Sequence, residues 1–207
     1  LTSLNTYFAG KYMVIDSSTR RNLELCETLR EKQKRGSLLW VLDKTKTAMG
    51  ARLLRSFIEQ PLIDKEEISN RLEAVGELKD NAICREELRE YLSPVYDLER
   101  LISKISYKTA NPRDLIAFGT SLSMLPHIKY ILSTMKSPLL VEVCEQMDEL
   151  QDVCDLIGRA IMEEPPIQIK DGGIIKEGYN EEIDRLRAAK TEGKTWLAQL
   201  EAKEREN

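Results

Sequence analysis

Two glycines near the C-terminal end of the chain have the spacing of a phosphate-binding loop. Gly173 and Gly178 are separated by four residues and stand just ahead of a helical pattern. Such a loop requires Lys and then Ser or Thr after the second glycine, because the Lys neutralises the β- and γ-phosphates and the hydroxyl ligates Mg²⁺. Here Tyr179 and Asn180 follow, and the next positions add negative charge: Glu181, Glu182 and Asp184. We therefore interpret the glycine spacing as structural.

The residues that commonly bind metals or act as nucleophiles are few and scattered. The chain has one histidine, His127, and its four cysteines form no C-x-x-C pair: Cys26, Cys84, Cys144 and Cys154. These features argue against a zinc site and favour buried free thiols in a reducing cytoplasm. Neighbouring acids such as Glu66 and Glu67 point to different faces of a helix, so they make poor acid–base pairs. We expect no catalytic, metal or cofactor-binding residue, no small-molecule substrate and no enzymatic activity in this chain.

The composition indicates a helical protein. Among 207 residues, 32% are charged, 42% are hydrophobic, and Gly and Pro are scarce. No stretch of about 18 apolar residues is found, so we expect no membrane span. The net charge of −4 argues against a domain with a basic surface for binding nucleic acid. Residues 20–55 nevertheless carry ten Lys or Arg against four Asp or Glu. That basic excess fits either a solvated surface or a surface that faces phosphate or an acidic partner.

The spacing of apolar residues predicts a mainly all-α fold. Helical patterns follow one another from about residue 20 to 162, and Asn111–Pro112 is a clear start signal for one of them. The first pattern covers residues 20–30, after a short β-prone run at Lys11–Asp16. Pro126 is expected to kink or end its helix.

The segment after Pro165–Pro166 differs in composition from the helical patterns before it. Two β-branched runs flank Gly172 and Gly173, which predicts a short β-hairpin near residues 167–177, because glycine takes the positive φ that tight turns require. Gly178 is expected to release the chain from the second strand, and Asn180 to cap a long helix that runs to about Asn207. No stop signal follows this helix and the chain begins without Met, so we expect the native chain to continue.

Four blocks of sequence, taken together, resemble the MutS family of DNA mismatch-recognition proteins. They read YMVIDSSTRRNLEL (12–25), LLWVLDKTKTAMGARLLRSFIEQPL (38–62), DLERLISKISYKTANPRDL (97–115) and DGGIIKEGYNEEIDRLR (171–187). They occur in the family's order and span almost the whole chain. They resemble the core, or lever, domain of that family, domain III.

This resemblance implies a role and a domain organisation. MutS-like proteins are bacterial, cytoplasmic dimers that clamp around DNA, associate with the nucleoid when on DNA, and use ATP and Mg²⁺ in an ATPase domain that this chain lacks. The implied organisation is a junction with a short strand (1–16), a helical lever domain (17–179) and an arm helix towards an absent clamp domain (180–207). The implied partners are DNA through the full-length protein, the other MutS domains and a second subunit. Mismatch reading and ATP hydrolysis are not expected of the chain itself.

The resemblance also marks individual residues. Arg20, Arg21, Asn22 and Glu24 match the family's RRNLE block, and they are either a junction that couples the lever to neighbouring domains or a capped helix start with polar contacts. Four cations of the arm either approach DNA phosphates or are solvated helix charges: Lys190, Lys194, Lys203 and Arg205. Two other functions stay open, namely a stand-alone helical scaffold for protein interactions and an independent nucleic-acid binder.

Overall fold

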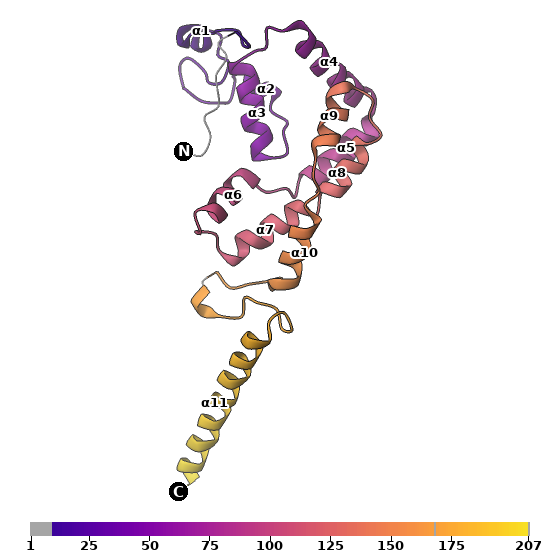
Figure 1. The fold of residues 1–207 in the computed structure, drawn as a ribbon. Helices are drawn as coiled ribbons and strands as arrows, with labels where there is room; N and C mark the ends of the chain where they lie inside the picture. Colours follow the sequence, from indigo (N-terminus) through magenta and orange to yellow (C-terminus); the bar gives the residue numbers. More distant parts are fainter. Residues whose placement is uncertain (1–9, 168, 207) are drawn as a thin grey trace.

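The structure, a computed structural model, describes residues 10–167 and 169–206, with side chains as far as residue 193. In this part of the chain the elements follow in the order α1 (Ser17–Asn22), α2 (Leu38–Leu42), α3 (Ala48–Glu59), α4 (Lys65–Asp80), α5 (Ala82–Leu92), α6 (Leu98–Ser106), α7 (Pro112–Leu122), α8 (Leu125–Leu132), α9 (Pro138–Gln146), α10 (Gln151–Ala160), the 3₁₀ turn η1 (Ile169–Asp171) and α11 (Glu181–Glu206) (Figure 1). No β-sheet forms within it. The predicted all-α class is confirmed.

Local capping explains where several of these helices begin. The side chains of Ser37, Thr47 and Asp64 accept hydrogen bonds from the backbone N–H groups of the first turns of α2, α3 and α4. Asn111 and Asp114 form a reciprocal capping box at the start of α7. Such caps satisfy backbone donors that have no partner inside the helix.

Two hydrophobic clusters fill the helical body, which we define as α4–α10. One lies mainly between α5 and α8 and contains Leu88, Val95, Ile128, Ile131, Leu132 and Met135. The other lies among α6, α7 and α10 and contains Leu101, Phe118, Leu122, Ile157, Ala160 and Ile161. Because α8 follows α7 after a two-residue break, the two clusters adjoin through these helices.

Helices α7 and α8 also form one stretch with membrane-like composition. Pro112–Leu132 is long and apolar enough to span a bilayer by composition alone, with a mean hydropathy of 1.2. The structure ends α7 at Leu122 and begins α8 at Leu125, with Pro126 in its first turn. Apolar side chains of the stretch Pro112–Leu132 pack in both hydrophobic clusters. Burial in the core therefore explains its apolar composition.

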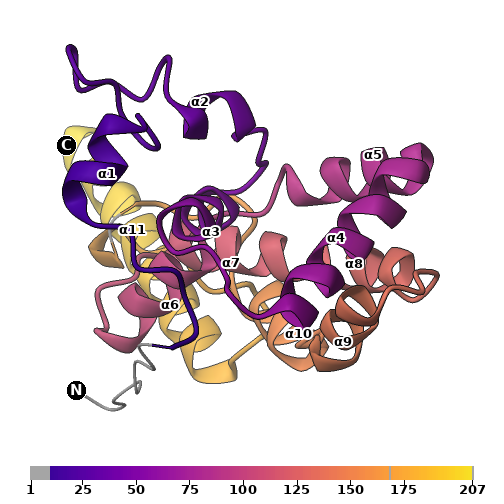
Figure 2. The same cartoon turned by 90° about the horizontal axis from the view of Figure 1, so that it is seen from above.

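The N-terminal module, defined as residues 10–63 with α1–α3, leads directly into α4 (Figures 1 and 2) and contacts it through the Lys11–Glu67 ion pair and through Arg71 over the Phe57 ring. Of the predicted strand at Lys11–Asp16, Tyr12 makes a single isolated bridge to Leu62. The predicted helix over residues 20–30 stops at Asn22, and Glu24 then takes a φ of 48°. Many apolar side chains of α2 and α3 are exposed: Leu38, Trp40, Val41, Leu42, Leu53 and Phe57.

The predicted β-hairpin near residues 167–177 is wrong. Ile169–Asp171 form a 3₁₀ turn, and Ile175 bridges Ile161 after α10 instead of the run before Gly172. Ile174 and Ile175 pack against the α6–α7–α10 cluster. A lone two-stranded hairpin is at best marginally stable in water, so burial against this cluster determines the pairing.

Helix α11 is the longest element and extends away from the rest of the molecule (Figure 1). Its 26 residues, at 1.5 Å per residue, reach about 39 Å. Leu186, near its start, is exposed, whereas Ile183 and Arg187 are half-buried. The helix therefore contacts the body at its root, and we call this segment the arm.

Candidate functional site

The root of the arm is held by backbone hydrogen bonds to the end of α10. The Met162 N–H donates to the Ile174 carbonyl at 2.8 Å, and the Lys176 N–H donates to the Ala160 carbonyl at 2.9 Å. The Lys176 Nζ also donates to the Gly158 carbonyl at 2.8 Å. The segment that precedes the arm is therefore fixed to the helical body.

Arg187 connects the arm itself to that segment. Its guanidinium donates to the Ile175 carbonyl at 2.8 Å and to the Asp184 carboxylate at 3.1 Å. Asp184 in turn accepts the Gly178 N–H at 2.8 Å. Gly172, Gly173 and Gly178 all have positive φ, between 70° and 82°. The Asn180 side chain accepts from the N–H groups of residues 182 and 183.

These contacts also explain why the glycine spacing is not a phosphate loop here. The Gly178 N–H, a donor that a phosphate would need, is bonded to the Asp184 carboxylate. An ionised carboxylate at a helix start is favoured by the helix dipole. The position of a bound anion is thus taken by the chain's own side chain.

The four candidate cations of the arm are spread along α11. Lys190 is exposed. Lys194, Lys203 and Arg205 lie within α11, but their side chains lie outside the described residues. Their approach to DNA phosphates stays a prediction.

Two of the four RRNLE-block residues meet at a cavity between α1 and α3. Arg20 and Arg21 line this cavity of about 290 Å³ together with Arg55. The Cys26 thiol donates to Glu59 at 3.3 Å, and burial together with this hydrogen bond raises the pKa of Cys26. A thiol with a raised pKa is a poor nucleophile, and the carboxylates of Glu27 and Glu59 line the cavity beside the three arginines.

The other two residues of that block act locally. Asn22 ends α1 and is exposed. The Glu24 carboxylate accepts the Leu29 N–H at 2.7 Å, and its carbonyl accepts the Leu38 N–H at 3.0 Å. They shape the loop that follows α1 and do not line the cavity.

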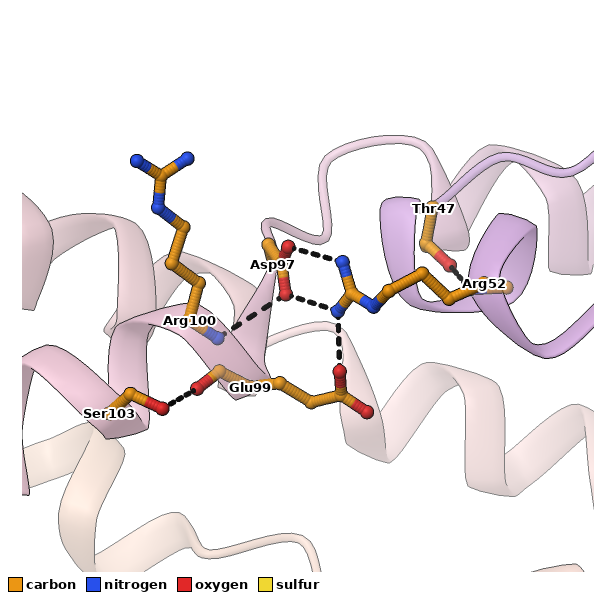
Figure 3. Close-up of polar contacts among 7 residues, drawn as sticks. Thr47, Arg52, Asp97, Glu99, Arg100 and Ser103 are labelled. Atoms are coloured by element: carbon orange, nitrogen blue, oxygen red, sulfur yellow. Dashed lines mark hydrogen bonds and ion pairs between the residues drawn. The ribbon is translucent and has the colours of Figure 1, made fainter. Parts of the chain in front are cut away.

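A contact that the sequence did not indicate joins the N-terminal module to the helical body. Arg52 of α3 donates to both oxygens of Asp97, at 2.8 and 2.7 Å, and to Glu99 at 2.5 Å (Figure 3). Asp97 also caps α6 by accepting the Arg100 N–H. The Arg52 guanidinium holds the pKa of Asp97 below its ordinary value. Arg52 and Asp97 lie 45 residues apart, so no local spacing could reveal the pair.

The residues that could bind a metal or act as nucleophiles have structural surroundings. No group of three His, Cys, Asp or Glu that could hold a metal occurs among the residues the structure describes. All four cysteines are free and half-buried. His127 stacks on Tyr91 with ring centroids 4.8 Å apart, beside the α5–α8 cluster.

Fold and site together define an all-helical domain from which one long helix projects on a fixed root. The family model of MutS domain III matches residues 18–206. The chain is 71% identical over 206 residues to the DNA mismatch repair protein MutS of Lachnoclostridium phytofermentans, covering all of this chain and 22% of that protein. It is 54% and 52% identical to the MutS proteins of Caldanaerobacter subterraneus subsp. tengcongensis and Acetivibrio thermocellus, again over the whole chain and 24% of each relative.

The chain therefore belongs to the MutS family, in which it corresponds to domain III. It spans about a quarter of the length of the curated relatives that it matches.

Proposed function

We propose that this chain is the lever of a DNA mismatch repair protein, and that it couples an ATPase domain to a DNA clamp. The observation that carries the proposal is the arm, a helix of 26 residues whose root is tied to the helical body by backbone and guanidinium hydrogen bonds. With a fixed root, a tilt of the body of roughly 10° moves the far end of a 39 Å helix by about 7 Å. A small rotation at one end thus becomes a large displacement at the other.

The exposed apolar surface of the N-terminal module supports a place within a larger protein. Four of the five residues of α2 are large apolar residues with at least 42% exposure. Contiguous apolar surface of this kind marks interaction sites in soluble proteins. We propose that other domains of the same protein pack there.

The partners and cofactors follow from this role. In the proposal, DNA is contacted through the full-length protein, a second subunit completes a dimer, and ATP with Mg²⁺ is bound by a separate domain. The chain itself reads no mismatch and hydrolyses no ATP, and the full protein acts in the bacterial cytoplasm.

Loss of Arg187 in the full-length protein tests the coupling. The Arg187→Ala variant loses the hydrogen bond to Ile175 and the ion pair with Asp184. We expect DNA binding and DNA-free ATP hydrolysis to persist, while the stimulation of hydrolysis by mismatched DNA falls about fivefold or more, since coupling is a free energy between two sites. The measurement is the hydrolysis rate with and without mismatched duplex.

The matched control is Arg185→Ala, two residues away on the same helix. Arg185 is exposed and pairs with Glu181 at 3.7 Å within the arm, so its loss should leave the stimulation unchanged. Normal stimulation in the Arg187→Ala protein would overturn the proposed coupling through the arm root.

A further inference from the structure

Arg52 makes an unusually complete ionic contact for an exposed side chain. Its planar guanidinium meets both oxygens of Asp97 and one of Glu99, at distances of 2.5–2.8 Å. Figure 3 shows Arg52 reaching from α3 to the first turn of α6. Bidentate pairs of this kind fix direction as well as distance.

The other contacts between the N-terminal module and the helical body are made to α4, α5 and the α5–α8 cluster. Helix α3 contacts α2 within the module, and it has no buried side chain. Lys11 pairs with Glu67 of α4 at 3.0 Å, and the Arg71 guanidinium of α4 lies 3.7 Å from the centre of the Phe57 ring. The Arg89 guanidinium donates to the Lys44 carbonyl at 3.2 Å, and Met49 packs at the edge of the α5–α8 cluster. Arg52 differs from these contacts because it ties the module to the start of α6.

The module itself is held together independently of that contact. The Met13 N–H donates to the Pro61 carbonyl at 2.8 Å, and Leu39 and Leu25 are joined by a 2.9 Å backbone hydrogen bond. A change at Arg52 can therefore turn the module as one piece without unfolding it.

The exposure of the partners sets the strength of the contact. The side chains of Arg52 and Glu99 are 49% and 70% exposed, and that of Asp97 is 23% exposed. Pairs in such surroundings are weakened by competing water and by salt. The contact is strong enough to favour one orientation and weak enough to open.

We propose that Arg52 is a releasable latch that sets the angle between the N-terminal module and the helical body. In the closed state the guanidinium bonds Asp97 at the start of α6, and in the open state the module turns at its junction with α4, between Ile63 and Lys65. Because α6 packs in the cluster to which the arm root is fixed, opening changes the angle between the module and the arm. The use of this angle as regulation rests on the proposed lever function, whereas the latch itself does not.

Spin-label distances test the latch. Ketone-bearing amino acids at positions 31 and 145, both exposed in the structure, carry nitroxides and leave the four cysteines unmodified. We expect one narrow distance for the otherwise unchanged chain at low salt. Arg52→Ala should raise the fraction of molecules outside that distance about two- to fivefold. About 1 M salt should raise this fraction more in the unchanged chain than in the variant, because both share the Lys11–Glu67 ion pair but only the unchanged chain has the Arg52 pairs to lose.

Two further variants make the result decisive. Asp97→Asn removes the charge but retains a capping side chain, so it should broaden the distances as Arg52→Ala does even if one variant folds poorly. Arg55→Ala removes an equal charge whose pairing with Glu59 stays within α3, and it should match the unchanged chain. If both Arg52→Ala and Asp97→Asn retain the narrow distance at low and high salt, the latch is overturned. That result would leave the coupling measured with Arg187→Ala untouched.

Discussion

The two ends of the helical body are joined to their neighbours by different kinds of contact. At the arm root, backbone hydrogen bonds link residues 160–162 to 174–176, and Ile174 and Ile175 pack against a buried cluster. At the N-terminal junction, exposed charges meet across α3 and α6. Backbone pairing beside a buried cluster is costly to break, whereas exposed ion pairs contribute little and respond to salt. The comparison indicates a fixed joint at the arm and an adjustable joint at the module.

The largest effect is expected from the packing that supports the fixed joint. Leu122 is 2% exposed in the α6–α7–α10 cluster, so Leu122→Ala should lower the free energy of unfolding by about 2–5 kcal/mol through lost burial and a cavity. Urea denaturation followed by circular dichroism measures this. Leu53→Ala in α3, where the side chain is 55% exposed, should cost under about 0.5 kcal/mol. Equal losses of unfolding free energy in the two variants would contradict the contrast between a tightly packed body and an exposed module.

A smaller effect is expected from the turn that leads into the arm. Gly178 has a φ of +82° with open space where a Cβ would stand, so Gly178→Ala should cost about 1–2 kcal/mol through backbone strain alone. Gly76 in α4 also has open space but helical geometry. Gly76→Ala should therefore stabilise the chain by up to about 1 kcal/mol. Thermal unfolding of both variants shows whether they shift in opposite directions, and a shift in the same direction would argue against strain at Gly178.

The smallest effect is a response of the adjustable joint to acid. The Arg52 hydrogen bonds hold the pKa of Asp97 below its ordinary value, and the backbone N–H and the charge of Arg100 lower it further. Glu99 shares the Arg52 guanidinium with Asp97. A carboxyl with a lowered pKa stabilises the folded contact above its unfolded pKa and loses that contribution as pH falls through the folded value. The distance between positions 31 and 145 should therefore broaden as pH falls from about 5 towards 3. In the Asp97→Asn variant the distance distribution should already be broad at about pH 5. A narrow distribution in this variant at that pH would contradict this account of the acid response.

Local sequence signals predicted the helical body well because its features are local. The Asn111–Pro112 start signal and the apolar spacing of residues 115–125 determine α7 through capping and period. The positive φ of Gly172, Gly173 and Gly178 likewise depends on the residue type. These parts need no information from distant residues.

The errors concern segments whose structure is set by distant partners. The hairpin prediction failed because Ile175 pairs with Ile161 instead of the neighbouring run. The helix expected over residues 20–30 stops at Asn22, because the Glu24 and Leu25 carbonyls accept N–H groups from residues 38 and 39. The Arg52–Asp97 pair lies 45 residues apart. No local spacing in a single sequence carries this information.

Hydrogen exchange at the arm root tests the central claim most directly. The Met162 and Lys176 amides form the two backbone bonds that fix the root. In the unchanged chain they should exchange within about tenfold of the amides in the middle of α7, and high salt should not alter them. Exchange several hundredfold faster than in α7, as in an exposed loop, would show that the arm is free at its root and would contradict its proposed action as a lever.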